Sequence, residues 1–516
     1  MRNASSISFA ISAITIATAA HVTGCFFNPV EDCQEAGECA TGAGGGGTTT
    51  NSGGAGGSIT PPGCIPSENS DPVEDDCGIF VSIAGDDNNP GTKSAPVATL
   101  AKAINLAQPD KGRVYACSEE FAESVTVPPD GKIYGGLDCA SDWKRIPGQK
   151  STIAPAADLV PVTLSGGPGA RIEDVTIKAA DATMPGGSSI AVIAEDGATA
   201  DLVRCDLAAG SGATGAVGAS ESLRAADGEN GNAPAAPGCT SAGIMPGGVT
   251  EENAGCIMSF GGEGGIGSVA QGGAGAPGQP GSTPGGNGQV ADCTDGGDGS
   301  AGLDGEAGPG AIGIGAIAAS GYLGAPGATG MTPGMPGHGG GGGGGARGSI
   351  VCANVMFAGH GGGSGAAGGC GGAPGGGGGP GGSSIGLLSH NAQISLMEVI
   401  ISTAAGGAGG IGGVGQEGGF GGSAGGQAGG PGACAGGKGG KGGYGGPGGG
   451  GLGGHSIGIA FLGMAPAQTG GSIGVPGTPG AGGPGAGAAP TPEAMGASGI
   501  ACKTIDFSEP GSCQLD

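Results

Sequence analysis

The sequence predicts an all-β solenoid, in which short strands stack as successive coils. A six-residue pattern, apolar-x-x-apolar-x-apolar, occurs at residues 172–177, 202–207, 352–357 and 396–401. A seven-residue leader that begins with Gly and has Ser-Ile at its third and fourth positions occurs at 187–193, 382–388 and 454–460. Apolar residues also recur at a regular interval between 115 and 191. A recurring short strand with small residues between its copies is typical of a stacked repeat protein.

The regular interval predicts a column of side chains. Parallel strands that lie one above another place equivalent residues in register. We therefore expect the members of the series to stack inside the body, with a second strand about ten residues after three of the starts, at 125–127, 162–164 and 202–207. The members of the series are Tyr115, Tyr134, Ile153, Ile172 and Ala191.

The composition excludes an ordinary globular core. Of 516 residues, 134 are Gly and 36 are Pro, and the aromatic residues are 10 Phe, 4 Tyr and 1 Trp. Glycine brings no side chain to bury and loses the most backbone freedom on folding. A solenoid needs only a thin aliphatic core, because each coil packs on its neighbours alone. One solenoid with large inserts is therefore predicted rather than several globular domains.

The net charge excludes a nucleic-acid partner. The chain has 17 Lys and Arg against 43 Asp and Glu, a formal charge of −26. A nucleic-acid binder needs clustered cations to neutralise phosphates. The acidity is typical of a surface that stays soluble. An anionic membrane would repel it, so membrane contact has to come from another source.

The N-terminus supplies that source. A start with one Arg, an apolar run over 5–20 and the residues Val22-Thr-Gly-Cys25 form a secretory signal. The segment resembles the bacterial lipoprotein signal. The resemblance implies cleavage after residue 24, a lipid on Cys25 and attachment to the outer membrane at the cell surface. Several acyl chains anchor a protein firmly, since each buried methylene contributes about 0.8 kcal/mol. An ordinary cleaved signal is the alternative.

Export predicts disulfides for the remaining cysteines. They show no Cys-x-x-Cys pair and no Cys/His metal spacing, as expected in an oxidising compartment. An odd number leaves one thiol unpaired. The local candidates for pairing are Cys33 with Cys39, Cys64 with Cys77, Cys117 with Cys139, and Cys502 with Cys513.

The folded part begins near residue 78. A strand is predicted over 78–84, before the turn Asp86-Asp87-Asn88-Asn89. The spacing of apolar residues over 96–107 predicts a short helix. The apolar face of that helix has Leu100, Ala103, Ile104 and Ala107. The four Asx side chains at 86–89 fit turn formation. Calcium binding is the alternative for them, and no other cofactor is expected.

The strand, the GDDNNPGT turn and the PVATLAKAINLA helix resemble the opening of right-handed parallel β-helix proteins of the pectate-lyase-like class. They are similar to the domain of unknown function that opens many secreted bacterial β-helices. The resemblance covers about 79–207, with Val97 where that domain has a large aromatic residue. It implies that the helix covers the open end of the first coil. Exposed solenoid ends need such a cover.

Glycine-rich tracts are predicted to leave the solenoid after the six-residue patterns and to rejoin it at the leaders. Inserts that share one corner must lie side by side, so we expect a glycine-rich flange along one edge. Collagen is disfavoured, because the triplet of Gly299, Gly302, Gly305 and Gly308 is too brief. Disorder and a bundle of extended polyglycine II helices both remain open at this point.

The domain boundaries follow from these features. The predicted segments are a signal at 1–24, a flexible tether at 25–77, capped coils at 78–207, a glycine-rich insert at 208–348, further coils at 349–464 interrupted at 358–382 and 404–453, a Gly/Pro/Ala-rich segment at 465–498 and a C-terminal strand or cap at 499–516.

The functional expectation is a non-enzymatic, lipid-anchored surface protein with a structural, adhesive, or glycan- or matrix-binding role, whose partners are extracellular glycans or matrix. It resembles the glycine-rich, PGRS-like secreted proteins. The Gly-x-Ser-x-Gly matches at 382–386 and 454–458 belong to the leaders and carry no catalytic triad. A polysaccharide lyase or hydrolase is the alternative, and it needs paired carboxylates or an Arg base. Its candidate residues are Arg171, Glu173, Asp174, Arg204 and Asp206.

Overall fold

The computed structural model describes residues 63–108, 112–256, 258–427, 432–487 and 490–515. All of these belong to one unit, Thr60–Asp516. The expected signal at 1–24, the lipid-bearing Cys25, most of the tether and the pair Cys33 and Cys39 lie outside the described residues.

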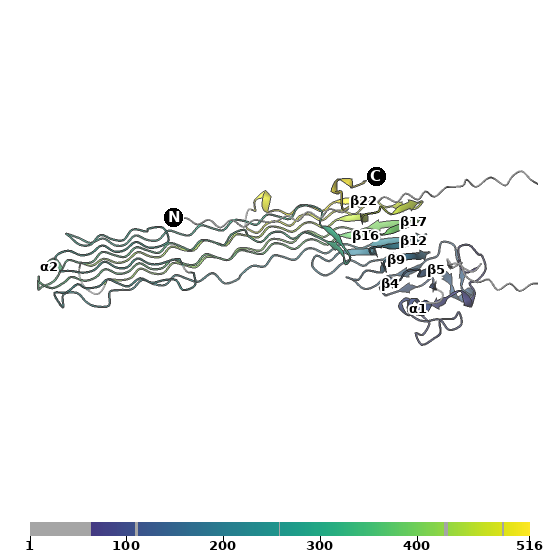
Figure 1. The fold of residues 1–516 in the computed structure, drawn as a ribbon, viewed down its shortest axis with the longest axis horizontal. Helices are drawn as coiled ribbons and strands as arrows, with labels where there is room; N and C mark the ends of the chain where they lie inside the picture. Colours follow the sequence, from purple (N-terminus) through teal and green to yellow (C-terminus); the bar gives the residue numbers. More distant parts are fainter. Residues whose placement is uncertain (1–62, 109–111, 257, 428–431, 488–489, 516) are drawn as a thin grey trace, which may run out of the picture. The chain divides into compact units, whose positions relative to one another are not determined.

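The protein is mostly β, and three parallel sheets that fit a β-solenoid form its core (Figure 1). From β2 onward the chain visits sheet 1, sheet 2 and sheet 3 in that repeating order. In spatial order, sheet 1 contains β1 (Ile79–Val81), β2 (Arg113–Cys117), β5 (Lys132–Asp138), β9 (Gly167–Glu173), β12 (Ala198–Val203), β17 (Gln393–Met397) and β20 (Ala467–Thr469). Sheet 2 contains β3 (Glu120–Phe121), β7 (Ser151–Ile153), β10 (Val175–Lys178), β13 (Asp206–Ala209), β18 (Ile400–Thr403) and β21 (Ser472–Ile473). Sheet 3 contains β4 (Val125–Val127), β8 (Val162–Leu164), β11 (Ser189–Ala194), β16 (Ser384–His390), β19 (Ser456–Leu462) and β22 (Ala501–Asp506).

Few other elements accompany the sheets. Strand β6 (Lys144–Arg145) pairs antiparallel with β5, and β14 (Ala316–Ala318) forms a hairpin with β15 (Gly321–Leu323). The helices are α1 (Leu100–Ala107) and α2 (Gly348–Val351). Single 3₁₀ turns occur at η1 (Asp75–Cys77), η2 (Cys139–Ser141), η3 (Pro492–Ala494) and η4 (Pro510–Ser512).

Helix α1 packs against the first strands of the solenoid, β1, β2 and β4. It begins where the Thr99 hydroxyl accepts a hydrogen bond from the Lys102 amide, a normal N-cap interaction. Its buried residues are the four expected from the helical spacing, Leu100, Ala103, Ile104 and Ala107. These residues join the main hydrophobic core.

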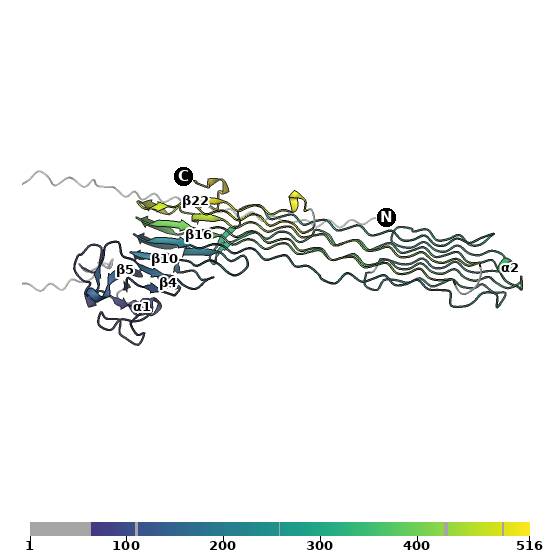
Figure 2. The same ribbon diagram turned by 180° about the vertical axis from the view of Figure 1, so that it is seen from behind.

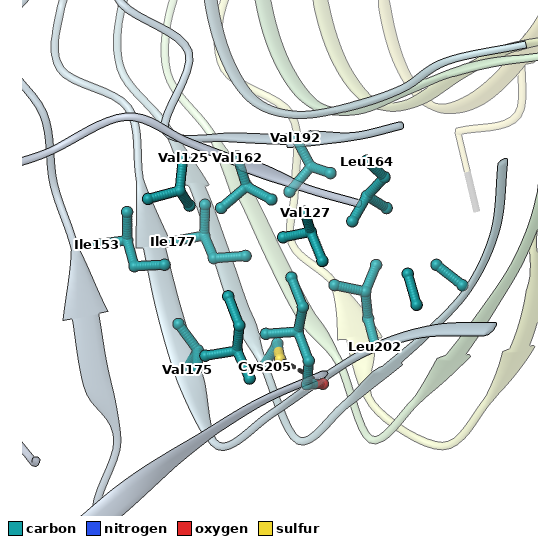
Figure 3. Close-up of a cluster of buried hydrophobic side chains, with 14 of the residues drawn as sticks. Val125, Val127, Ile153, Val162, Leu164, Val175, Ile177, Val192, Leu202 and Cys205 are labelled. Carbon is teal, nitrogen blue, oxygen red and sulfur yellow. Dashed lines mark hydrogen bonds between the residues drawn. The ribbon is translucent and has the colours of Figure 1, made fainter. Parts of the chain in front are cut away.

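The interior of the solenoid is a column of aliphatic side chains contributed by all three sheets (Figure 3). In sheet 1 the inward column consists of Val114, Ile133, Ile172, Leu202 and Leu396, each paired in register with the next. All five are at most 2 % exposed. Each coil thus seals the next from water, which is the main stabilising contribution in such a fold.

The predicted column at 19-residue intervals is wrong. Tyr115 and Tyr134 do pair and stack, with ring centroids 5.4 Å apart, but both lie on the outer face of sheet 1 in a separate cluster. Ile153 belongs to sheet 2 and pairs with Ile177. The coils differ in length, since the register partners Val114, Ile133, Ile172 and Leu202 are separated by 19, 39 and 30 residues. The disulfides Cys64–Cys77 and Cys117–Cys139 cover the two tyrosines, and the Tyr115 hydroxyl donates to the Cys64 carbonyl over 2.7 Å.

The six-residue patterns are corners rather than single strands. In each of three copies the first apolar residue is the second-last residue of a sheet 1 strand. The second apolar residue begins or directly precedes a sheet 2 strand, and the third lies within that strand. The residue just before the second apolar position has a left-handed backbone, with φ of 52° at Asp174, 51° at Arg204 and 55° at Glu398. That conformation turns the chain so that all three apolar side chains face inward.

The leaders align as predicted. Ser189, Ser384 and Ser456 pair in register across sheet 3, as do the isoleucines that follow them. Inward residues of these strands enter the main core, whereas Ile190, Ile385 and Ile457 face a second cluster that contains Tyr322 of β15. Strands β11, β16 and β19 are therefore buried on both faces, which explains why apolar residues predominate in them.

Glycine-rich segments leave the solenoid from sheet 2 and return to sheet 3. Excursions follow β13, β18 and β21 and end at β16, β19 and β22. We call residues 210–383, 404–455 and 474–500 the glycine flange, and each extended piece of it a run. Both ribbon views show the runs side by side (Figures 1 and 2). Of the two states left open from the sequence, the structure has the ordered bundle.

The runs have the three-residue period of polyglycine II helices. In the run 432–455, the Gly442 amide donates to the Gly419 carbonyl, the Gly443 amide to the Met335 carbonyl, and the Tyr444 amide to Asp304 Oδ1. Three successive residues thus bond to three different neighbouring runs. Two of these positions admit glycine alone: a Cβ at Gly442 would lie 2.0 Å from the Cys370 carbonyl oxygen.

The expected strand at 352–357 and the coil predicted to begin at 349 are wrong. Residues 348–351 form α2, and 352–357 are turns within the first excursion, which therefore runs unbroken from β13 to β16. Three disulfides hold runs of the flange together: Cys239–Cys352, Cys256–Cys370 and Cys293–Cys434. Cys502 pairs with Cys513, and Cys205 is the free cysteine of the described residues.

Candidate ligand-binding surface

Two surface runs of the flange display about one side chain outward in every three residues. Residues 436–444 read GGKGGKGGY, and 406–420 contain the same Gly-Gly-x pattern. The two glycines of each triplet face neighbouring runs, so the third residue points to solvent. With a rise of about 3.1 Å per residue, displayed side chains recur every ~9.3 Å along a run. The displayed residues on these two runs are Ile411, Val414, Glu417, Phe420, Lys438, Lys441 and Tyr444.

Part of this display forms an aromatic and charged patch. Phe420 and Tyr444 are 47 % and 45 % exposed, and they are the two exposed aromatic side chains of the described residues. The Arg224 guanidinium lies 4.1 Å from the Phe420 ring centroid. Lys441 Nζ lies 5.5 Å from that centroid and 4.7 Å from the Tyr444 centroid. We call these four residues, with Asp227 and Glu417, the aromatic–charged patch.

Ion pairs hold the charged members of the patch in place. Lys441 Nζ is 2.7 Å from Glu417 Oε1, and Arg224 Nε is 3.0 Å from Asp227 Oδ1. The hydrogen bond from Lys441 lowers the pKa of Glu417 and raises the pKa of Lys441 itself. Exposed pairs of this kind contribute little to stability. Their effect is to hold the Arg224 and Lys441 side chains beside the two rings.

Acidic side chains protect the backbone at the edges of this surface. Asp295, Asp298 and Asp304 accept the amides of Ala435, Lys438 and Tyr444. Unpaired amides at a sheet edge invite pairing with another chain. The acidic caps occupy those amides, so this face of the flange offers side chains rather than backbone to a partner.

The residues considered for catalysis form a salt-bridge cluster on the outside of the sheet 1–sheet 2 corner. Asp174 accepts from Arg145 Nε at 2.6 Å and from Arg204 Nε at 2.8 Å. Glu173, which is 1 % exposed, pairs with Arg171 and Arg204. Asp206 lies apart from these residues and pairs with Lys150 at 2.5 Å.

The electrostatics of this cluster disfavour proton transfer by the Asp174 carboxylate. Burial alone would raise the pKa of Asp174, but the hydrogen bonds from Arg145 and Arg204 outweigh burial and lower it. A general acid needs the opposite shift, toward neutral pH. The arrangement therefore fits a structural network that links neighbouring coils.

The side chains of the Asx turn at 86–89 form hydrogen bonds within the turn and with the segment that precedes α1. The Asp87 carboxylate accepts from the Ala98 and Thr99 amides and from the Thr99 hydroxyl, ahead of α1. Asp86 accepts from the Asn88 amide and side chain, and the Asn89 side chain donates to the Pro96 carbonyl. Among the described residues, no group of three His, Cys, Asp or Glu is placed to hold a metal ion.

His455 is buried where the flange meets sheet 3. Its Nδ1 accepts from the Ile500 amide at 3.0 Å, which places the proton on Nε2. Nε2 lies 2.8 Å from the Ile314 carbonyl and 3.0 Å from the Tyr322 hydroxyl. Burial lowers the pKa of His455, and the Ile314 carbonyl opposes that shift in part.

Acidification should destabilise this junction. A histidine with a lowered folded-state pKa binds more protons when unfolded, so its stabilising contribution is lost as pH falls below about 6.5. We expect the melting temperature of the wild-type protein to fall between pH 7.5 and pH 5 relative to that of His455→Asn. Thermal unfolding of both proteins at the two pH values checks this. Parallel pH profiles would contradict it.

Sequence reasoning missed the displayed residues of the flange. Its candidates were the four Asx residues at 86–89 and the charged residues of the solenoid. The signal was nevertheless present, since Gly-Gly-x triplets with a changing third residue mark a helix of period three.

Comparisons with known proteins give little further guidance. No protein-family model matches the chain, and no curated protein matches it. Among solved structures, a rhamnogalacturonan lyase aligns with a TM-score of 0.20 and 15 % identity. The alignment covers 25 % of this chain and 36 % of the lyase. A likeness this slight carries no argument about activity. Within the described residues, no helix has the length and apolar character to cross a membrane.

Proposed function

We propose that this protein is a non-enzymatic, lipid-anchored protein of the cell surface that binds polysaccharide through its glycine flange. In this proposal the solenoid is a right-handed parallel β-helix, and it holds the flange by its sheet 2 and sheet 3 strands. The aromatic–charged patch carries the proposal.

The chemistry of the patch suits sugars. The apolar face of a pyranose ring stacks on an exposed aromatic ring, and its hydroxyls bond to flanking charged groups. Phe420 and Tyr444 supply two rings on neighbouring runs, with Lys441 and Glu417 beside them. The ~9.3 Å interval of the display is close to the length of a disaccharide unit, so an extended polysaccharide meets the surface repeatedly. The ion pairs order the side chains in advance, which lowers the entropic cost of binding.

Binding to immobilised neutral and acidic polysaccharides tests the proposal. We expect Phe420→Ala with Tyr444→Ala to weaken binding about tenfold or more, because central aromatic residues contribute on the order of 1–2 kcal/mol each. Val475→Ala removes a side chain that is 89 % exposed outside the patch, and it should leave binding unchanged. Equal affinities of the double variant and the wild type for every polysaccharide bound would refute the assignment of the patch.

The anchor is tested separately. We expect the wild-type protein to partition with membranes in its producing cell and to incorporate a labelled fatty acid, because acylated Cys25 inserts its chains in the bilayer. Cys25→Ala should abolish both. Labelling that survives this substitution would exclude lipid attachment at Cys25.

A further inference from the structure

A hollow in the flange lies on runs other than those that form the aromatic–charged patch. It has a volume of about 440 Å³. Its walls come from the run 294–311, the run 324–346 and the turns near residues 258 and 280. Three of its lining side chains carry soft or borderline donor atoms: Met258, Met335 and His338.

Backbone bonds place the three residues together. The Met335 and His338 amides donate to the carbonyls of Leu303 and Ser300, on the same neighbouring run. Met335 and His338 are three residues apart on a helix of three residues per turn. Their side chains therefore leave the same face of the run, about 9.3 Å apart. The Ser259 hydroxyl donates to the Gly337 carbonyl over 2.8 Å, which brings Met258 beside His338.

The donors are free to bind. Met258 and Met335 are 66 % and 59 % exposed, although methionine is normally a core residue. Within the described part of the chain, neither ring nitrogen of His338 takes part in a hydrogen bond. The remaining walls are mostly Pro, Ala, Gly and Leu, so no carboxylate competes for a hard cation.

We propose that this hollow binds a soft monovalent cation, Cu(I) or Ag(I), through the thioethers of Met258 and Met335 and the imidazole of His338. Thioether ligands select soft ions such as Cu(I), whereas carboxylate and carbonyl sets suit Mg²⁺ and Ca²⁺. Imidazole completes a three-coordinate set without adding charge. Flexible methionine side chains span the gap between the runs. This site is independent of polysaccharide binding.

Silver titration tests the site, because Ag(I) has the ligand preference of Cu(I) without its redox chemistry. Accessible thiols of the full chain are first alkylated, and the disulfides are left intact. We expect saturable binding of one Ag(I), with shifts of the Met258 and Met335 methyl resonances. Met335→Leu and His338→Phe should each weaken binding at least tenfold, and Zn²⁺ should not compete.

Met495→Leu is the matched control, since Met495 is 49 % exposed and lies outside the hollow. Its affinity for Ag(I) should equal that of the wild type. Circular dichroism checks that each variant remains folded. Non-saturable silver uptake, equal losses in Met335→Leu and Met495→Leu, or displacement of silver by Zn²⁺ would each overturn the proposal.

Discussion

Replacing Gly442 by valine is expected to destabilise the glycine flange by about 4 kcal/mol. The new Cβ would lie 2.0 Å from the Cys370 carbonyl oxygen and 2.5 Å from the Cys370 carbonyl carbon. Both are backbone atoms of a packed neighbouring run, so no side-chain rotation relieves the clash. Overpacking costs about 1–3 kcal/mol, and each hydrogen bond lost between runs adds about 1 kcal/mol.

Gly426→Val is the control for this prediction. The same substitution there meets no atom within 4 Å. Amide hydrogen exchange measures the local effect, because it reports the opening of the flange separately from that of the solenoid. We expect faster exchange across the runs that contact Gly442 in the first variant and wild-type rates in the second. Unchanged exchange in Gly442→Val would show that the runs are not packed at backbone contact distance.

Replacing Asp174 by asparagine is expected to lower the free energy of unfolding of the solenoid by about 3 kcal/mol. Removing one partner of a buried ion pair costs about 3–5 kcal/mol because the other charge stays buried. Arg145 is 15 % exposed at its side chain and loses the carboxylate that it contacts, while Arg204 keeps Glu173. Asparagine also tolerates the left-handed backbone of this corner, so the effect reports charge rather than strain.

Asp142→Asn provides a matched control. Asp142 also has a left-handed backbone, with φ of 56°, and pairs with Lys93, but its side chain is 69 % exposed. Exposed pairs contribute about 0–1 kcal/mol. Denaturant unfolding of both variants should therefore separate them clearly. Similar losses would indicate that the cluster does not hold neighbouring coils together.

The same cluster gives wild-type stability an acid dependence. The lowered pKa of Asp174 adds stability above the unfolded-state pKa, and that stability is lost as pH falls below about 4. Asp174→Asn lacks this contribution at every pH. The difference in unfolding free energy between wild type and variant should shrink toward pH 2.

The strands of the solenoid were predictable where a repeated residue pattern marks buried positions and its copies pair with one another in register. The leaders at 187, 382 and 454 contain Ser-Ile at the same offset, and these residues pair across sheet 3. Three of the four six-residue patterns identified buried residues correctly, but they form corners rather than the expected single strands. Three apolar positions look alike on a strand or at a corner, and the left-handed residue between them can be Asp, Arg or Glu.

Other features depend on neighbours that the local sequence does not specify. The pattern at 352–357 contains the right apolar residues, but no sheet lies beside it, and Val355 and Met356 remain exposed. Tyr115 and Tyr134 are buried outside the coil because a disulfide-bonded segment covers them. The patch on the flange joins residues 224, 420 and 441, whose proximity follows only from the ordered packing of the runs.

The period of the flange sets a rule for changes in its length. Deleting one residue from a run rotates everything beyond it by a third of a turn, so that a displayed side chain is driven into a neighbouring backbone and a glycine faces solvent. Deleting a whole Gly-Gly-x triplet preserves the phase and only shortens the run. Two neighbouring runs bond at every third residue, as the amides of Gly442, Gly445 and Gly448 do with the carbonyls of Gly419, Gln416 and Gly413. A triplet removed from one run therefore has to be matched in those beside it. The flange can therefore lengthen or shorten only in steps of three residues, taken together by neighbouring excursions.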